Sequence, residues 1–498
     1  MDIYSLFDKQ CNQTPQNIAL QIKKDEFTYS QLRNASYRIT NMLSTSGVKS
    51  GEIICILIKN SMELVASIFA VLKIGAICLP VSPDTPPDRI ASILKNSGTR
   101  VLLKCSKSSY ENIVNNVLSF DVDIEIDKYE PLNCMHSKHN IKGTDPAYCI
   151  YTSGSSGSPK GVLLAHAGII NHMIAKRKLL KISQDTTMCL SFSIGFVASI
   201  WQILLPLITG ATLVLYPGEV MHNIKLLLRS IERDNIETIS LIPQQLETYL
   251  KLAKHRNRFE PLTSLRNIIL TGEVVRPKLV ETFYSHFSEI RLINAYGQTE
   301  CSDDTLHHII DPSQRTERIP IGKPIENISV MILGDEMRPV SKGEKGELYI
   351  AGVGLAIGYL NDTDLNDRNF FINQNNRLYR TGDIVYEDID GDIVFIGRAD
   401  NQVKISGHRF ELEEIEAYIK QYPAIDHTIV RVIESQRLEV LYSSANTIDT
   451  ICLQNYLSRK LPNSLLPSKY TRVMEFAYMS NGKIDRQKYC APKKCSFE

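Results

Sequence analysis

The 498-residue sequence lacks an excess of charge of either sign. It contains 56 Lys and Arg residues against 55 Asp and Glu residues, which gives a formal net charge of +1. Proteins whose main partner is nucleic acid or an anionic membrane usually concentrate positive charge. The composition therefore supports neither of these partners.

The sequence also lacks cysteine pairs with metal-binding spacing. Its eleven cysteines are scattered along the chain. No apolar signal peptide opens the sequence. Together these absences predict free thiols and a location in the reducing cytoplasm.

A membrane-spanning segment is missing as well, although residues 186–218 contain no charged side chain. Gln202, Pro206, Gly210 and several hydroxyl side chains interrupt this run. The stretch 210–216 has the pattern of a turn followed by a buried strand after a helix. We therefore interpret the run as part of a folded core rather than a membrane span.

The chain is longer than one hydrophobic core usually supports, so at least two domains are expected. Apolar runs at 53–58, 101–103 and 238–242 predict buried strands, and amphipathic patterns at 61–74 and 224–233 predict helices between them. Such alternation favours the α/β class, with parallel sheets covered by helices on their faces.

The predicted pattern of secondary structure changes after about residue 330. Short strands with Gly and Asp turns follow, and residues 387–395 have the pattern of a hairpin. The last hundred residues alternate again, with a helix expected at 411–421, a strand at 428–432 and a helix at 453–460. This pattern predicts a small α+β domain at the C-terminal end.

Residues 151–161 read YTSGSSGSPKG and have the composition of a phosphate-binding loop. Glycine lets backbone N–H groups face an anion, the hydroxyl side chains add donors, and Lys160 adds a positive charge. The loop is not the common P-loop, which requires Ser or Thr after the lysine, where this chain has Gly161. Taken alone, such a run also fits a flexible surface loop. The apolar segment 147–150 before it favours a strand that feeds a phosphate site.

Further motifs surround this loop in the sequence. They are FTYSQL at 27–32, LKIGAICLP at 72–80, NAYGQTE at 294–300, GELYIAG at 346–352, YRTGD at 379–383, GRADNQVKISGHR at 397–409 and NGKIDR at 481–486. In order and spacing the set resembles the adenylate-forming superfamily: acyl-CoA and aryl-CoA synthetases, luciferases and the adenylation domains of nonribosomal peptide synthetases. The residues within these motifs are most similar to those of a stand-alone amino-acid adenylation domain.

The resemblance implies an enzyme that activates a carboxylic acid with ATP and Mg²⁺. It implies a large N-terminal domain over residues 1–399, made of parallel α/β sheets plus a small β-barrel-like part. A small mobile α+β lid would cover residues 400–498, with a hinge at Asp400. The implied ATP-binding residues are Thr152, Ser153, Gly154, Ser155, Ser156, Gly157, Lys160, Asn294, Ala295, Tyr296, Gly297, Thr299, Asp383 and Arg398.

Several residues carry specific roles by this resemblance. Lys483 would bridge the carboxylate and the α-phosphate, and Lys404 would serve the thioester-forming step after the lid rotates. Glu300 would bind Mg²⁺, because a hard cation prefers carboxylate oxygen. Asp383 would accept the ribose hydroxyls, with Arg398 assisting. Read without the motifs, Lys483 would be an ordinary solvated lysine and Asp383 a turn or cap residue.

The substrate pocket is expected from alignment with amino-acid adenylation domains. Its residues are Phe196, Val197, Ala198, Trp201, Gln244, Ile269, Thr271, Ala295, Asp303 and Asp304. The aspartate that usually pairs with the substrate ammonium is absent at both positions where the family places it, Val197 and Ala198. A buried ammonium without a carboxylate is costly, so an ordinary α-amino acid is disfavoured.

Asp303 and Asp304 place two adjacent carboxylates in the expected pocket, and two carboxylates favour a cation. The sequence therefore predicts a substrate with a displaced amine or guanidine. In the alternative interpretation, one aspartate caps a helix or faces water, and the substrate is a neutral hydroxy or keto acid.

The expected acceptor of the activated acyl group is phosphopantetheine on a separate carrier protein, in nonribosomal peptide or other natural-product biosynthesis. Free coenzyme A is the alternative acceptor. A catalytically inactive nucleotide-binding sensor is a remote alternative, because Lys160, Glu300, Asp383 and Lys483 are all present. Luciferase-like oxidation uses the same adenylating residues, and no motif specifically favours it.

Overall fold

The computed structural model describes residues 1–106, 117–123, 140–154, 158–256, 258–314, 316–373, 375–400, 402–405, 407–423, 425–433, 437–444, 446–474, 476–477, 484 and 486–489. The expected phosphate-loop residues Ser155, Ser156 and Gly157, and the expected catalytic Lys483, lie outside the described residues.

The first large sheet is mainly parallel. In spatial order its strands are β15 (Lys323–Pro324), β14 (Asp303–Ile309), β13 (Arg291–Gln298), β12 (Asn267–Thr271), β11 (Thr238–Leu241), β9 (Thr187–Cys189), β10 (Thr212–Leu215), β1 (Ile18–Ile22) and β2 (Asp25–Thr28). The strands from β13 to β1 run parallel, whereas β14 returns antiparallel along β13. The NAYGQTE motif thus ends β13 and turns directly into β14.

The second large sheet carries the phosphate-loop motif. Its strands, in spatial order, are β18 (Gly358–Tyr359), β8 (Lys160–Ala165), β7 (Pro146–Thr152), β4 (Ile77–Pro80), β3 (Ile53–Leu57), β5 (Val101–Lys104) and β6 (Leu118–Asp121). The strands from β7 to β6 are parallel, and β7, β8 and β18 are antiparallel neighbours. The loop therefore connects two hydrogen-bonded strands.

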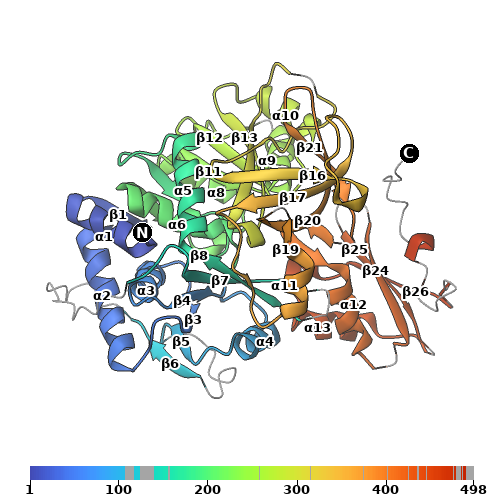
Figure 1. Cartoon of the computed structure of the whole chain (residues 1–498), viewed down its shortest axis with the longest axis horizontal. Helices are drawn as coiled ribbons and strands as arrows, with labels where there is room; N and C mark the ends of the chain where they lie inside the picture. The colour runs from blue at the N-terminus through green and yellow to red at the C-terminus, as the bar shows by residue number, and fades with distance from the viewer. Residues whose placement is uncertain are drawn as a thin grey trace.

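Helices cover both sheets, as Figure 1 shows. In the larger domain they are α1 (Ile3–Gln13), α2 (Tyr29–Thr45), α3 (Met62–Lys73), α4 (Pro87–Ser97), α5 (His166–Leu180), α6 (Ala198–Thr209), α7 (Gly218–Met221), α8 (Ile224–Arg233), α9 (Pro243–His255), α10 (Pro277–Tyr284) and α11 (Thr363–Asn369). Their apolar sides form continuous buried clusters with the strands. The expected α/β class and the expected strand and helix at 53–58 and 61–74 are confirmed.

The uncharged stretch 186–218 forms β9, α6 and β10 in the core. Gly210 adopts φ of 87°, a left-handed conformation that favours glycine, and it ends α6. The buried Tyr29 hydroxyl donates to the carbonyl oxygens of Ala211 at 2.7 Å and Pro206 at 3.1 Å. Across the described part of the chain, no helix has the length and apolarity needed to cross a membrane.

An antiparallel sheet follows the two large sheets. It contains β16 (Ile328–Leu333), β17 (Gly346–Gly352), β19 (Phe370–Asn373), β20 (Asn376–Glu387) and β21 (Ile393–Arg398). The hairpin expected at 387–395 is present, with Glu387 opposite Ile393. The same pairing places Asp383 on β20 opposite Arg398 on β21.

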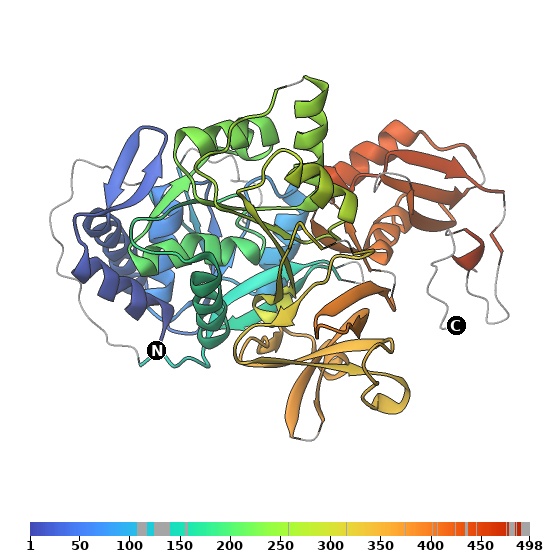
Figure 2. The ribbon, with the colours of Figure 1, turned by 90° about the horizontal axis from the view of Figure 1, so that it is seen from above.

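The C-terminal segment forms its own α+β unit. Its elements are β22 (Gln402–Ile405), β23 (His408–Glu411), α12 (Leu412–Lys420), β24 (His427–Ile433), β25 (Arg437–Ser443), α13 (Thr450–Ser458) and β26 (Lys469–Arg472). One apolar cluster, from Ile405 to Leu465, lies wholly within this unit. Figure 2 shows the unit, in orange to red, beside the main body. The boundary at 399/400 and the hinge at Asp400 stay predictions.

A buried ion pair connects this C-terminal unit to the larger domain. The Arg89 guanidinium on α4 lies 2.7 Å from the Glu414 carboxylate on α12, and their side chains are 9% and 0% exposed. Burial raises the pKa of Glu414, and Arg89 opposes that rise. Asp88, next to Arg89, lies 3.6 Å from the mostly exposed Arg459.

We predict that Arg89→Ala loosens the contact between the two units, because it leaves the buried Glu414 carboxylate without its cation. Breaking a buried pair in this way costs about 3–5 kcal/mol. Limited proteolysis should cut the segment near Asp400 faster in the variant. Arg459→Ala, which removes an exposed partner on the same face, is the control. Equal cleavage rates in the variant and the native chain would show that the Arg89–Glu414 pair does not hold the units together.

We also predict a pH-dependent stability of the C-terminal unit that arises from Glu439 on β25. Burial alone would raise the pKa of this carboxyl, but Lys469, Thr471 and Arg431 outweigh burial and lower it from 4.5 to about 2. Its stabilising contribution is therefore complete above pH 4.5 and is lost as the pH falls toward 2. Calorimetric unfolding between these pH values should show this loss. In Glu439→Gln the corresponding part of the pH dependence should be absent.

Candidate functional site

The best-connected buried polar network of the expected nucleotide site surrounds Asp383. Arg398 Nη1 lies 2.5 Å from Asp383 Oδ1 across the β20–β21 pair. The Tyr296 hydroxyl and the Gln298 side-chain amide, which are both on β13, donate to Asp383 Oδ2, the latter at 3.1 Å. Three donors from two sheets thus fix the position of this buried carboxylate, and charge-assisted bonds of this kind are strong.

The remaining residues of the NAYGQTE motif form the end of β13. The buried Asn294 side chain donates to the Pro320 carbonyl oxygen at 2.7 Å. Gly297 lies where a Cβ atom would come within 1.9 Å of the Asp303 carbonyl oxygen. The close approach of β14 therefore requires glycine at this position.

Glu300 and Lys160 both lie close to one tyrosine, Tyr359. Thr299 and Glu300 form a short 3-10 helix after β13, and Glu300 is fully buried. The Tyr359 hydroxyl donates to Glu300 Oε1 at 2.8 Å, and the Lys160 ammonium lies 5.3 Å from the Tyr359 ring centre. Tyr359 was not identified from the sequence. Its short strand, β18, carries no motif that would reveal its position beside Glu300.

The described part of the phosphate loop faces carboxylates of the C-terminal unit. The Gly154 N–H donates to Glu414 Oε2 at 3.2 Å, and Lys160 Nζ lies 4.0 Å from Glu411 Oε1. Thr152 Oγ1 is buried and has no hydrogen-bond partner within the described ranges. Backbone amide, ammonium and hydroxyl groups, which can all donate to anionic oxygen, are thus grouped at this loop, and the first two already face carboxylates.

Two residues of the C-terminal unit were expected at the site. Lys404 on β22 lies with its ammonium 5.8 Å from the centre of the Tyr296 ring. Asp400 accepts two hydrogen bonds from Arg398, each 2.6 Å long. Asp400, the predicted hinge residue, is therefore hydrogen-bonded to Arg398, the same arginine that pairs with Asp383.

The expected substrate-pocket residues come from several elements. Phe196 and Val197 lead into α6, where Ala198 is the first residue and Trp201 lies one turn inside. Ile269 and Thr271 lie on β12, and Gln244 lies at the start of α9.

The structure brings four of the expected pocket residues into one cluster: Trp201, Thr271, Asp303 and Asp304. Thr271 Oγ1 donates to Asp304 Oδ1 at 3.1 Å.

A buried lysine occupies the centre of this cluster. Lys176 on α5 lies with its ammonium 2.6 Å from Asp304 Oδ2 and 5.0 Å from the Trp201 ring centre. The Lys176 and Asp304 side chains are 0% and 2% exposed. The chain itself thus supplies a cation to Asp304. The predicted substrate with a displaced amine or guanidine stays a prediction, and it now depends on Asp303.

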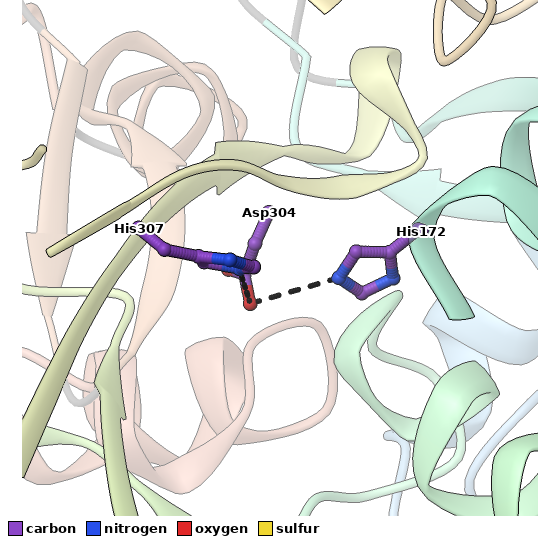
Figure 3. A group of neighbouring side chains, drawn as sticks. All are labelled: His172, Asp304 and His307. Atoms are coloured by element: carbon purple, nitrogen blue, oxygen red, sulfur yellow. Dashed lines mark ion pairs between the residues drawn. The ribbon is translucent and has the colours of Figure 1, made fainter. Parts of the chain in front are cut away.

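Two histidines complete the cluster, as Figure 3 shows. His172 Nε2 and His307 Nε2 lie 3.8 Å and 3.9 Å from Asp304 Oδ2. His172 is one helical turn before Lys176, so both share one face of α5. A β-bulge that makes Thr305 an extra residue in β14 brings His307 to the same side as Asp304. The four-residue spacing of His172 and Lys176 was the available sequence signal, but it does not reveal their partner.

The charges of this cluster follow from burial and from the lysine. Burial raises the pKa of Asp303 well above its ordinary value, and the neighbouring Asp304 raises it further. Burial opposes ionisation of Asp304 too, but Lys176 and the two histidines hold its pKa well below the ordinary value. Burial lowers the pKa of His172, and it lowers that of His307 to about 4. Burial thus favours the uncharged forms of the groups that surround the ion pair.

Comparison with known proteins shows the family to which this chain belongs. The family model described as AMP-binding enzyme matches residues 7–360. Tyrocidine synthase 3 of Brevibacillus parabrevis is 34% identical over 500 residues, which covers 98% of this chain and 8% of that synthase. The chain therefore spans a small part of this relative. Zwittermicin A synthase ZmaJ of Bacillus cereus is 31% identical, with 97% of this chain and 94% of that protein covered.

A solved structure agrees with the sequence relatives. It is NpsA-ThdA, an artificially fused adenylation-PCP di-domain of a nonribosomal peptide synthetase from Klebsiella oxytoca. It matches with a TM-score of 0.83 and 27% identity, over 95% of this chain and 94% of that chain. The chain therefore belongs to the AMP-binding enzyme family and is an AMP-forming ligase with the fold of an adenylation domain.

Proposed function

We propose that this ligase activates a carboxylic acid and passes it as a thioester to a carrier protein in nonribosomal peptide or other natural-product biosynthesis. An oxygen of the acid attacks the α-phosphorus of ATP, the bond to the β-phosphate breaks, and pyrophosphate leaves. The thiolate of phosphopantetheine then attacks the acyl carbon, and AMP leaves. Positioning and charge neutralisation are the protein's contribution to both steps.

The Asp383 network is the observation that carries the nucleotide part of this proposal. Asp383 would accept the ribose hydroxyls, since Arg398 and the β13 donors already fix its orientation. Tyr296 would stack on adenine, with Asn294, Ala295 and Gly297 along the same strand. The phosphate loop would bind the triphosphate, for which Thr152 Oγ1 is an available donor. The Gly154 N–H now donates to Glu414 and would have to exchange that partner for a phosphate oxygen.

Glu300 is the residue that would bind Mg²⁺. Its carboxylate oxygens are ligands of the type that this hard cation prefers, and the Tyr359 hydroxyl orients one of them. Bound Mg²⁺ would offset the negative charge of the triphosphate.

The two half-reactions would use different lysines. We propose that Lys483 stabilises adenylate formation and that Lys404 serves thioester formation after the lid rotates about Asp400. The position of Lys404 over the Tyr296 ring, with the lid docked through Arg89 and Glu414, supports the second assignment.

A separate carrier protein is the proposed acyl acceptor. The adenylation-PCP fusion among the similar structures supports a carrier protein as acceptor. Free coenzyme A is the alternative acceptor. Thioester formation assayed with a phosphopantetheinylated carrier and with coenzyme A in parallel will distinguish the two.

For the substrate, we propose a neutral hydroxy or keto acid. Val197 and Ala198 provide no carboxylate for an α-ammonium, and Lys176 neutralises Asp304. The second candidate is an acid with a displaced amine or guanidine. It is favoured by Asp303, whose Oδ2 is buried without a hydrogen-bond partner in the described parts of the chain.

We predict that the chain catalyses acid-dependent ATP–pyrophosphate exchange. A panel of hydroxy, keto, α-amino, β-amino, ω-amino and guanidino acids tests both substrate classes. Exchange with hydroxy or keto acids supports the main proposal. Exchange confined to cationic acids, and lost in Asp303→Ala, would support the second candidate instead. No exchange with any acid would favour the nucleotide-binding sensor.

We further predict that Asp383→Asn raises the KM for ATP by about 10–100-fold, because it weakens charge-assisted hydrogen bonds to ribose worth about 1.5–3 kcal/mol. The KM for the acid should change little. Arg380→Ala is the control, because Arg380 lies on the same strand as Asp383, is half-exposed and pairs with Glu347 on β17. An unchanged KM for ATP in Asp383→Asn would refute the ribose-binding role.

A further inference from the structure

Lys176 and Asp304 form a rigid buried pair beside the expected substrate pocket. Thr271 donates to the second oxygen of Asp304, and the Trp201 ring lies beside the lysine ammonium. Thr271, Trp201 and Asp304 all belong to the pocket expected from the sequence, whereas Lys176 does not. The lysine therefore contacts residues expected to line that pocket, from a helix to which no pocket role was assigned.

Three polar atoms around this pair lack partners. Within the described residues, His172 Nε2, His307 Nε2 and Asp303 Oδ2 are buried and make no hydrogen bond. His172 Nε2 lies within 4.0 Å of both aspartates. Buried polar atoms are nearly always hydrogen-bonded in folded proteins, so three unpartnered atoms in one cluster indicate a polar ligand.

A metal ion fits this cluster poorly. His172, Asp304 and His307 offer ligand atoms within 4.8 Å of one another. However, the oxygen that Asp304 would offer is already 2.6 Å from the Lys176 ammonium. A divalent cation at the centre would lie beside this buried positive charge, and their repulsion disfavours metal binding.

The charge of the cluster also selects among organic ligands. Lys176 and Asp304 balance each other, and burial favours uncharged Asp303, His172 and His307. A ligand ammonium would be repelled by Lys176, and a second carboxylate would be repelled by Asp304. A hydroxyl or keto oxygen adds no charge and can accept a hydrogen bond from the lysine.

We propose that Lys176, held in place by Asp304, is a specificity-determining residue that donates a hydrogen bond to a hydroxyl or keto oxygen of the acid substrate. His172 and His307 line the same wall and complete the contacts of that oxygen. This inference rests on the proposed function, and it names the residues that would distinguish a hydroxy or keto acid from its unsubstituted analogue.

The test compares ATP–pyrophosphate exchange for hydroxy, keto, unsubstituted and amino analogues of one acid. Lys176→Met leaves Asp304 buried without its cation and can impair folding. The decisive variant is therefore the double substitution Lys176→Met with Asp304→Asn, which removes both charges together. Lys178→Met is the control, because Lys178 is 63% exposed on the same helix and pairs with Glu326.

In the native chain, kcat/KM should be higher for the hydroxy or keto acid than for the unsubstituted acid. In the double variant this ratio should fall by about tenfold, the effect of one lost hydrogen bond. The KM for ATP should not change. A preserved ratio in the double variant, or a native preference for the amino analogue, would overturn the inference. Absence of exchange with every acid would instead refute the proposed function.

Metal content provides an independent readout. Elemental analysis of the purified native chain should find no stoichiometric zinc or other transition metal. A stoichiometric metal that is lost in His172→Phe would overturn the inference, since the cluster would then be a metal site.

Discussion

The energetic cost of burying charge governs how the described residues are arranged around β13. A carboxylate removed from water must receive donors from the chain, or its pKa rises until it is neutral. Asp383 receives Arg398, Tyr296 and Gln298, and Asp304 receives Lys176 and Thr271. For Asp303, burial and the neighbouring Asp304 outweigh the nearby lysines, and its pKa is raised. One rule thus separates Asp383, the carboxylate proposed to accept the ribose hydroxyls, from the Lys176–Asp304 pair beside the proposed substrate pocket, which is already neutralised.

The same rule connects the C-terminal unit to the larger domain. Glu414 is buried at their contact, where it receives Arg89 and the Gly154 N–H of the phosphate loop. Glu411 approaches Lys160 in the same region. Carboxylates of the C-terminal unit therefore face donors that the proposed mechanism assigns to the triphosphate. The proposed two-step mechanism would require the C-terminal unit to exchange these contacts for others, and polar contacts of this kind would meet that requirement.

Much of the fold could be predicted from the sequence. Strands and helices such as β3, α3, β11 and α8 lie close to the predicted residues, because their apolar periodicity is a local property. The end of β13 and the β20–β21 pair could be recognised from contiguous motifs for the same reason. The contact of Tyr359 with Glu300 could not, because it joins residues 59 positions apart and β18 has no pattern of its own.

The sequence by itself indicated the class of reaction, because the order and spacing of its motifs, among them the loop at 151–161, NAYGQTE and YRTGD, resemble those of the adenylate-forming superfamily. It also established that Val197 and Ala198 provide no carboxylate for a substrate ammonium. Only the tertiary structure decided which side chain neutralises Asp304. Lys176 lies on α5 and Asp304 on β14, and a β-bulge sets which side chains of β14 face that helix. Burial and through-space electrostatics depend on such long-range packing, so the identity of the counter-ion was not encoded in any local pattern.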